Sequence, residues 1–147
     1  MEQGITLKKM NEPEVMELIS KSKGFYNTFL RANDNIKKLF IQLACESSIF
    51  SCNDNGYVKE MVETGYRLAK RYIRGRRIQN YCMFTISSEQ KVIIDVRTDG
   101  LEIKSEIINL MNRGNCFSGG FEWYRFSIKS ESELVEALKL IELCYKN

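Results

Sequence analysis

The chain has 147 residues, of which 44% are apolar and 28% are charged, and its formal net charge is +3. This composition is too apolar for a disordered chain, and a chain of this length buries roughly two thirds of its unfolded surface, so we expect it to fold without metals or disulfides. Histidine is absent, which excludes Ser/His/Asp and Cys/His catalytic groups, H-E-x-x-H metal sites and histidine pH switches.

The N-terminal part of the chain has the apolar spacing and the capping residues of helices. Asn11 and Glu14 have the spacing of a capping box, and the helix that follows them is expected to end at Gly24. Asn33 is a further capping residue, and apolar residues at steps of three and four predict a second helix from about Asp34 to Ser47.

A third helix is expected over about Tyr57–Ile73, after a polar loop at residues 51–56. Its apolar stripe consists of Val58, Met61, Val62, Gly65, Ala69, Tyr72 and Ile73. The basic residues of this segment fall on the side away from the stripe, so the helix would present a positively charged face.

From residue 80 the pattern becomes typical of strands. Tyr81–Ile86 and Lys91–Arg97 are rich in β-branched and aromatic residues, and the polar residues 87–90 between them predict a hairpin loop. Phe121–Ile128 is a third expected strand, since its apolar residues alternate.

Two further helices are predicted in this half of the chain. Asp99 with Glu102 has a capping-box spacing and opens a helix that Gly114 ends, and Ser130 with Glu133 opens the last helix. The predicted fold is therefore α+β, with an N-terminal three-helix segment followed by a small, mostly antiparallel ββαβα layer. We expect a single domain over residues 1–147, with a helical subdomain at 1–78 and a ββαβα subdomain at 79–147.

The positive charge is concentrated in one part of the chain. The net charge is −1 over residues 1–64, +5 over 65–104 and −1 over 105–147, and six of the eleven residues from 67 to 77 are basic. Such a strip attracts phosphate backbones, and nearby tyrosines can stack on bases. The candidate nucleic-acid-binding residues are Arg67, Lys70, Arg71, Arg74, Arg76 and Arg77, with Tyr72 and Tyr81 as stacking partners. The alternative is a solvated helix face whose arginines pair with acids of the last helix.

The predicted hairpin contains a pattern that is typical of a second chemistry. Glu89-Gln90-Lys91 has the E-x-K pattern of restriction-type nucleases, in which an acid holds Mg²⁺ and the lysine stabilises charge. Asp95 is the acid available beside it, but residues 64–88 contain no acid that could complete such a centre. We therefore assign no metal ligand and keep a small metal-dependent nuclease as an alternative only.

The cysteines and the hydropathy bear on the compartment. The five cysteines are far apart and form no C-x-x-C pair, which indicates reduced thiols in a cytoplasmic protein. No stretch approaches 18 consecutive apolar residues, and residues 1–10 lack the features of a secretory leader, so no membrane association is expected.

Three features of the C-terminal half occur together in a known family. They are an aromatic-rich hairpin over Tyr81–Arg97, a Gly119-Gly120 turn entering a strand, and the run Ser130–Leu134 leading into a helix that ends near Tyr145. With them the stretch from about Tyr72 to Tyr145, about half of the chain, resembles the small domain of unknown function labelled "predicted transport protein", which occurs alone or beside restriction-endonuclease-like domains. The resemblance carries over no catalytic residues, and the association with nuclease-like domains implies a nucleic-acid or defence-related accessory role.

The leading hypothesis is a cytoplasmic, non-enzymatic module that binds nucleic acid through its basic helix face and uses no cofactor. A protein-interaction module, either a homodimer or an inhibitor that docks on an acidic surface, is the first alternative. The metal-dependent nuclease is the second.

Overall fold

The computed structural model describes residues 5–6, 10–51, 57–62, 65–72 and 78–147. Within these ranges the helices are α1 (Glu12–Lys21), α2 (Lys23–Arg31), α3 (Asp34–Ser47) and α4 (Glu131–Lys146), with a short 3-10 helix, η1 (Ser48–Ser51). The strands are β1 (Ile5–Thr6), β2 (Tyr57–Val62), β3 (Gly65–Arg71), β4 (Ile78–Ser87), β5 (Lys91–Arg97), β6 (Met111–Gly114) and β7 (Trp123–Ile128).

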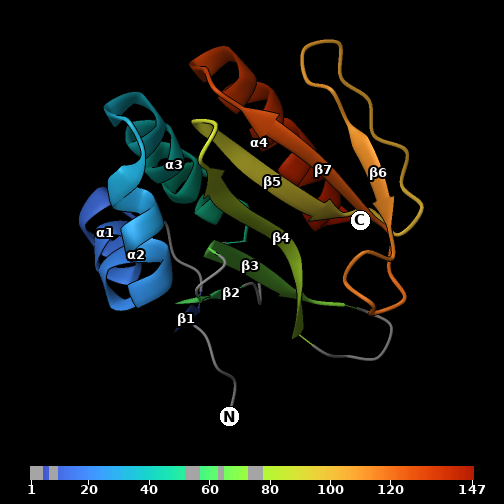
Figure 1. Cartoon of the computed structure of the whole chain (residues 1–147). Coiled ribbons are helices and arrows are strands. Elements are labelled where there is room, and N and C mark those ends of the chain that lie inside the picture. Colours follow the sequence, from blue (N-terminus) through green and yellow to red (C-terminus); the bar gives the residue numbers. More distant parts are fainter. Residues whose placement is uncertain (1–4, 7–9, 52–56, 63–64, 73–77) are drawn as a thin grey trace.

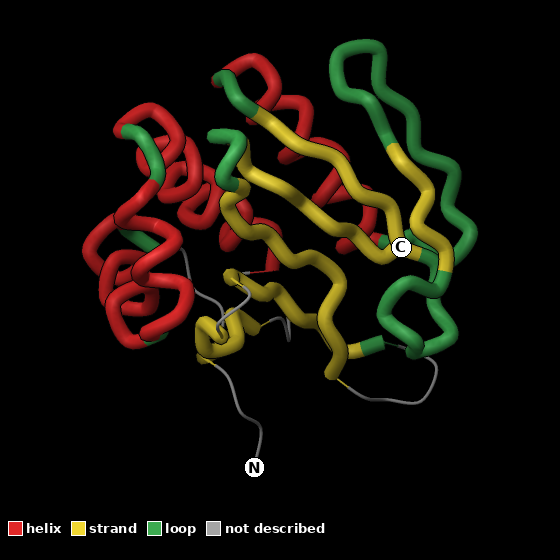
Figure 2. The backbone as a smooth tube through the Cα atoms, viewed as in Figure 1, coloured by secondary structure: helices red, strands yellow, loops and turns green. Residues whose placement is uncertain are grey.

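The strands form one antiparallel sheet in the order β1-β2-β3-β4-β5-β7-β6. In the view of Figure 1, α3 and α4 lie behind this sheet, and α1 and α2 continue the helical layer beyond α3. The opposite face of β4, β5 and β7 carries no helix from the described residues (Figure 2). This arrangement confirms the α+β class, with three N-terminal helices ahead of an antiparallel sheet.

No helix in the described ranges is both long enough and apolar enough to cross a bilayer.

The helices and the sheet share one hydrophobic core. The ring of Phe40 on α3 lies 5.0 Å from that of Phe25 on α2 and 5.4 Å from that of Phe84 on β4. Tyr66 on β3 stacks on Phe84 with 4.8 Å between the ring centroids. A buried aromatic side chain contributes about 2–3 kcal/mol to stability. β3 precedes residue 78 and pairs with β4, which begins there, so residues from both predicted subdomains contribute to the same core.

Several predicted elements are confirmed. α3 has the predicted bounds, and the Asn33 side chain accepts a hydrogen bond from its third backbone N–H. α1 begins with the expected capping box at Asn11, and α4 begins at the expected cap, Ser130. The hairpin of β4 and β5 and the strand β7 also form as expected. The N-terminal segment contains three helices as expected, but α2, between α1 and α3, takes the place of the predicted third helix.

The helix predicted over Tyr57–Ile73 is wrong, because the described part of this segment forms β2 and β3. Tyr66 and Leu68 are fully buried at a spacing of two residues, which is the period of a strand. Gly65 begins β3 with a φ of +126°, and a Cβ there would lie only 2.4 Å from the carbonyl oxygen of Phe84. The apolar residues happened to recur at helical spacing, and pairing with β4 outweighs that local preference.

The helix expected to begin at Asp99 is also wrong. Residues 101–110 form neither helix nor strand, and β6 follows them. Asp99 and Gly100 have φ values of +49° and +87°, which a right-handed helix does not adopt. Ile103 and Ile108 are both buried in the core, so these two side chains anchor the segment. The C-terminal order is therefore β4, β5, β6, β7 and α4 rather than ββαβα.

Candidate nucleic-acid interface

The predicted basic helix face does not form, because its residues belong to β3 and to the segment that follows it. Arg67 lies within β3 and is half-buried. Arg71 is the last residue of β3, and its side chain is outside the described part of the structure. Three of the predicted residues lie wholly outside the described ranges: Arg74, Arg76 and Arg77.

Lys70 faces the protein interior, and the residue is only 8% exposed to solvent. Its Nζ donates hydrogen bonds to the backbone carbonyls of Cys144, at 3.1 Å, and Tyr145, at 2.5 Å. These carbonyls lie at the C-terminal end of α4, where a helix carries partial negative charge. Burial lowers the pKa of the Lys70 amine. Lys70 therefore clamps the end of α4 to the sheet and is not a surface contact.

A second buried cation, Arg97, accounts for the position of Tyr72. The guanidinium carbon of Arg97 lies 3.7 Å from the centroid of the Tyr72 ring and 3.4 Å from that of Phe121, so the group is stacked between two rings. Its Nε and Nη2 donate to Asp99 at 2.9 Å, and its Nη1 donates to Gln79 at 2.9 Å. The ring of Tyr72 is thus engaged by Arg97 within the protein.

Tyr81 is completely buried, and its ring packs 5.2 Å from that of Tyr145 on α4. Burial raises the pKa values of Tyr72 and Tyr81 above the ordinary tyrosine value. Within the described residues neither hydroxyl has a hydrogen-bond partner. The structure therefore brings Lys70, Tyr72 and Tyr81 together, but around an internal cluster where Tyr81 is not accessible to a base.

A different set of cations lies on the open face, which we define as the side of β3, β4, β5 and β7 turned away from α3 and α4. Side chains alternate along a strand, and the core residues Ile94 and Val96 flank Asp95, so Asp95 belongs to this face. The strand register sets one residue from each of five strands side by side. This row consists of Arg67 on β3, Met83 on β4, Asp95 on β5, Arg125 on β7 and Met111 on β6.

Arg125 and Asp95 form a bidentate pair at the centre of the row. Nε of Arg125 donates to Oδ1 of Asp95 at 2.8 Å, and Nη2 donates to Oδ2 at 3.1 Å. The hydrogen bond with Asp95 raises the pKa of Arg125. The Asp95 side chain is 10% exposed and that of Arg125 is 34% exposed. The pair thus fixes the guanidinium in place and leaves about a third of it in contact with solvent.

The rest of the open face is mostly short or apolar. The next row consists of Thr85, Ile93 and Ser127. Lys91 ends the face opposite Ser87, and its Nζ lies 3.4 Å from the exposed carboxylate of Glu89. Such an exposed pair contributes at most about 1 kcal/mol, so it leaves Lys91 able to exchange partners. Among the described side chains of these strands, Arg67, Lys91 and Arg125 are the cations of the open face that are not buried, and Asp95 is its acid. Arg97, two residues beyond Asp95 on β5, is buried between the rings of Tyr72 and Phe121.

The residues of the nuclease alternative do not converge. Glu89 lies in the turn between β4 and β5, whereas Asp95 lies four residues beyond Lys91 along β5, about 13 Å away. Both oxygens of Asp95 accept from Arg125. The described ranges contain no group of three or more Cys, Asp or Glu side chains placed to hold a metal ion.

Comparisons of the chain with protein-family models, with curated proteins and with solved structures find no match. The resemblance of the C-terminal half to the domain labelled "predicted transport protein" therefore stays a prediction.

Sequence reasoning did not single out Asp95 and Arg125 as a pair. The alternation of β7 already separated Arg125 from its core-facing neighbours, which was a usable signal. The register that sets Arg125 opposite Asp95 could not be predicted, because residues 98–122 separate β5 from β7 and no tight turn fixes how the two strands align.

Proposed function

We propose that the chain is a nucleic-acid-binding module whose contact surface is the open face of the sheet. The row of Arg67, Asp95 and Arg125 is the observation that carries this proposal. Arg67 and Arg125 are separated by three strand spacings, about 14 Å, which is a span that a nucleic-acid backbone covers with two or three phosphates. The net charge of +5 over residues 65–104 also favours an anionic partner for this part of the chain.

The expected mode of binding is weakly dependent on sequence. Arginine and lysine contacts to phosphates position a nucleic acid without reading its bases, and the short side chains Thr85 and Ser127 leave room for a backbone to approach the sheet. This proposal replaces the basic helix face with a strand surface and leaves out Lys70 and Tyr81, which are buried. A defence-related accessory role is one setting for such a module, and it rests on the family resemblance alone.

The test is fluorescence anisotropy with short labelled single- and double-stranded DNA and RNA at about 50 and 200 mM salt. Contacts to three phosphates weaken binding by about 40-fold over this range. We expect micromolar binding at low salt with a dependence of this order. Absence of binding at low salt, or affinity that salt does not change, would contradict the proposal.

A protein-interaction module is the second candidate, and exposed apolar residues near the edge strand β6 favour it. Ile107 and Met111 are 57% and 55% exposed, and β6 pairs with β7 alone among the described strands. A homodimer or an acidic partner protein could use this edge. Light scattering of the purified protein separates this candidate, since a stable dimer doubles the measured mass.

We place this activity in the cytoplasm. Cys82, Cys116 and Cys144 are free thiols in the described part of the chain, which supports a reducing compartment.

A further inference from the structure

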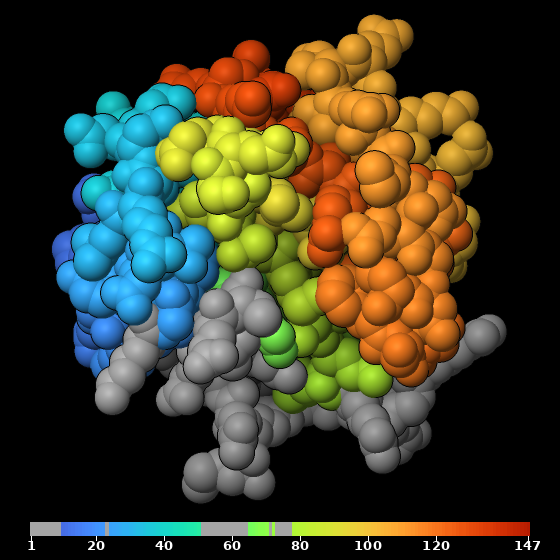
Figure 3. Space-filling model, in the orientation of Figure 1, coloured from blue at the N-terminus to red at the C-terminus, as the bar shows by residue number. Residues whose placement is uncertain are grey.

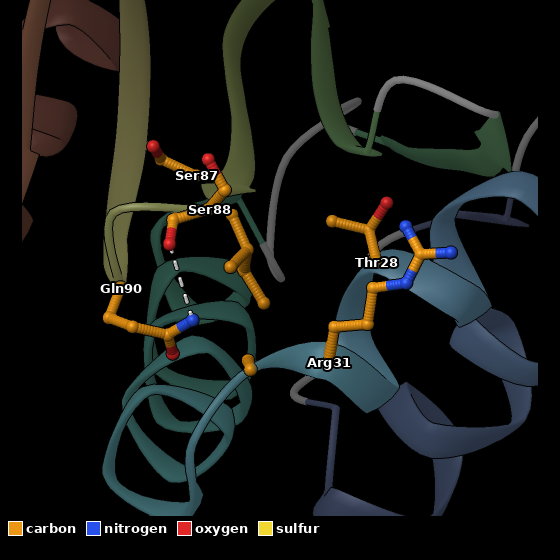
Figure 4. Close-up of a pocket in the computed structure, with 7 residues that line it drawn as sticks. Thr28, Arg31, Ser87, Ser88 and Gln90 are labelled. Atoms are coloured by element: carbon orange, nitrogen blue, oxygen red, sulfur yellow. Dashed lines mark hydrogen bonds between the residues drawn. The ribbon is translucent and has the colours of Figure 1, made fainter.

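A half-open pocket of about 270 Å³ lies between α2 and the turn that joins β4 to β5 (Figure 4). It is lined by Thr28, Arg31, Ala32, Ile86, Ser87, Ser88 and Gln90. Figure 4 shows Thr28 and Arg31 on the α2 side, across from Ser87, Ser88 and Gln90 on the turn side. Figure 3 shows the same two elements, α2 in light blue and the turn in yellow-green, meeting at the surface of the molecule. The pocket is therefore open to molecules in solution.

The turn side of the pocket is held in a defined position by Gln90. This residue has a φ of +60°, which is unusual for a residue other than glycine. Its Oε1 accepts a hydrogen bond of 2.7 Å from the backbone N–H of Asn33, at the start of α3. With its oxygen held there, the amide nitrogen of Gln90 points back to the carbonyl of Ser88 at 3.5 Å, a long and weak contact. Gln90 thus fixes the turn to the helical layer and leaves an amide donor at the pocket.

The lining is positively charged and rich in donors. Arg31 is the sole charged residue of the lining, and no ion pair or hydrogen bond of its guanidinium is found in the described ranges. The hydroxyl of Thr28 donates to the carbonyl of Gly24 within α2, at 3.4 Å, so the hydroxyls of Ser87 and Ser88 are the further donors of the lining. The nearest acid in the sequence, Glu89, pairs with Lys91 instead. A lining with one unpaired guanidinium, the two serine hydroxyls and no carboxylate is suited to an anion.

The size of the pocket limits the anion. Sites for whole cofactors and drug-sized molecules occupy about 300–1,000 Å³, so this pocket accommodates a single small group. Phosphate matches the planar fork of an arginine and accepts several hydrogen bonds at once. Because Arg31 ends α2, where the helix carries partial negative charge, an anion here depends on the guanidinium and not on the helix dipole.

We propose that the pocket between α2 and the β4–β5 turn binds a phosphate group, with Arg31 as the principal contact. The group is either free inorganic phosphate or the terminal phosphate of a monoester whose remainder extends through the open mouth. This proposal does not depend on nucleic-acid binding by the open face, because the guanidinium that carries it belongs to α2 and not to the sheet.

The experiment is a titration of the ¹⁵N-labelled protein with inorganic phosphate at constant ionic strength, followed by amide chemical shifts. We expect saturable shifts at Thr28, Ser87 and Ser88 with a dissociation constant in the millimolar range. The Arg31→Gln variant should bind about tenfold more weakly or worse, because it loses a charge-assisted hydrogen bond. Lys38→Gln is the matched control, since Lys38 is an exposed cation on α3 outside the pocket and its loss should change nothing.

Phenyl phosphate and acetate distinguish the sources of the group. Binding of both phosphates supports a monoester site, binding of inorganic phosphate alone supports a site for the free ion, and equal binding of acetate overturns the assignment to phosphate. Shifts that do not saturate, or an Arg31→Gln variant that binds as the wild type does, would also overturn it.

Discussion

Replacing Lys70 by methionine removes a buried charge while keeping a side chain of similar length. The Lys70 amine donates to two of the last carbonyls of α4, and a charged hydrogen bond contributes about 1.5–3 kcal/mol. Attraction to the helix end adds about 0.3–2 kcal/mol, and the cost of burying the amine offsets part of the total. We expect the free energy of unfolding at pH 7 to fall by about 2 kcal/mol, which lowers Tm by roughly 4–8 °C for a chain of this size.

The same substitution predicts a dependence on pH. Burial lowers the pKa of Lys70 in the folded protein below its ordinary value of 10.5. Between the two pKa values the unfolded chain binds more protons than the native protein, so the stability of the wild type rises with pH there. Lys70→Met lacks this titration, so the loss of stability that it causes should grow as the pH is raised toward 10.5.

Urea unfolding followed by circular dichroism at pH 7 and pH 9.5 measures both effects. The anisotropy assay on the same variant should show nucleic-acid affinity within about twofold of the wild type, because Lys70 is internal. Unchanged stability together with lost affinity would refute the assignment of Lys70 as a clamp and return it to the binding surface.

Two further predictions concern the sheet. Gly65→Ala should lower the free energy of unfolding by about 2–4 kcal/mol, because its Cβ would lie 2.4 Å from the carbonyl oxygen of Phe84. Gly100→Ala is the control, since Gly100 has a φ of +87° with open space around it, and this substitution should cost only about 1 kcal/mol. Equal losses of stability in urea unfolding would contradict the close approach at Gly65. Arg125→Gln should lower the free energy of unfolding by about 1–3 kcal/mol, because it leaves the nearly buried Asp95 carboxylate without its cation. Adding Asp95→Asn should recover more than half of that loss. Strictly additive losses in this double-mutant cycle, measured by urea unfolding, would show that the two residues do not interact.

The parts of the fold that could be predicted are those set by local signals. Asn11, Asn33 and Ser130 cap their helices as expected, since a capping side chain and its backbone partner lie three residues apart. The β4–β5 hairpin was equally local, because its loop and its alternating strands are contiguous in sequence.

The errors arose where distant contacts decide the structure. Residues 57–62 and 65–71 form strands because β3 pairs with β4 and β2 pairs with β3. The capping pattern at Asp99 fails because that side chain instead pairs with Arg97. The error in the candidate site has the same cause. A helical model of residues 57–73 placed Lys70 among the exposed cations, whereas in β3 it lies on the same side as the core residues Tyr66 and Leu68.

The measurement that tests the open face most directly compares the salt dependence of two charge-matched variants. Arg67→Gln with Lys91→Gln removes two cations from the open face, and Lys38→Gln with Lys139→Gln removes two exposed cations from α3 and α4. If the open face binds phosphates, the first variant should lower the slope of log affinity against log salt by about 1.8, and the second should leave it unchanged. Equal changes in the two variants would show that net charge, and not this surface, governs binding.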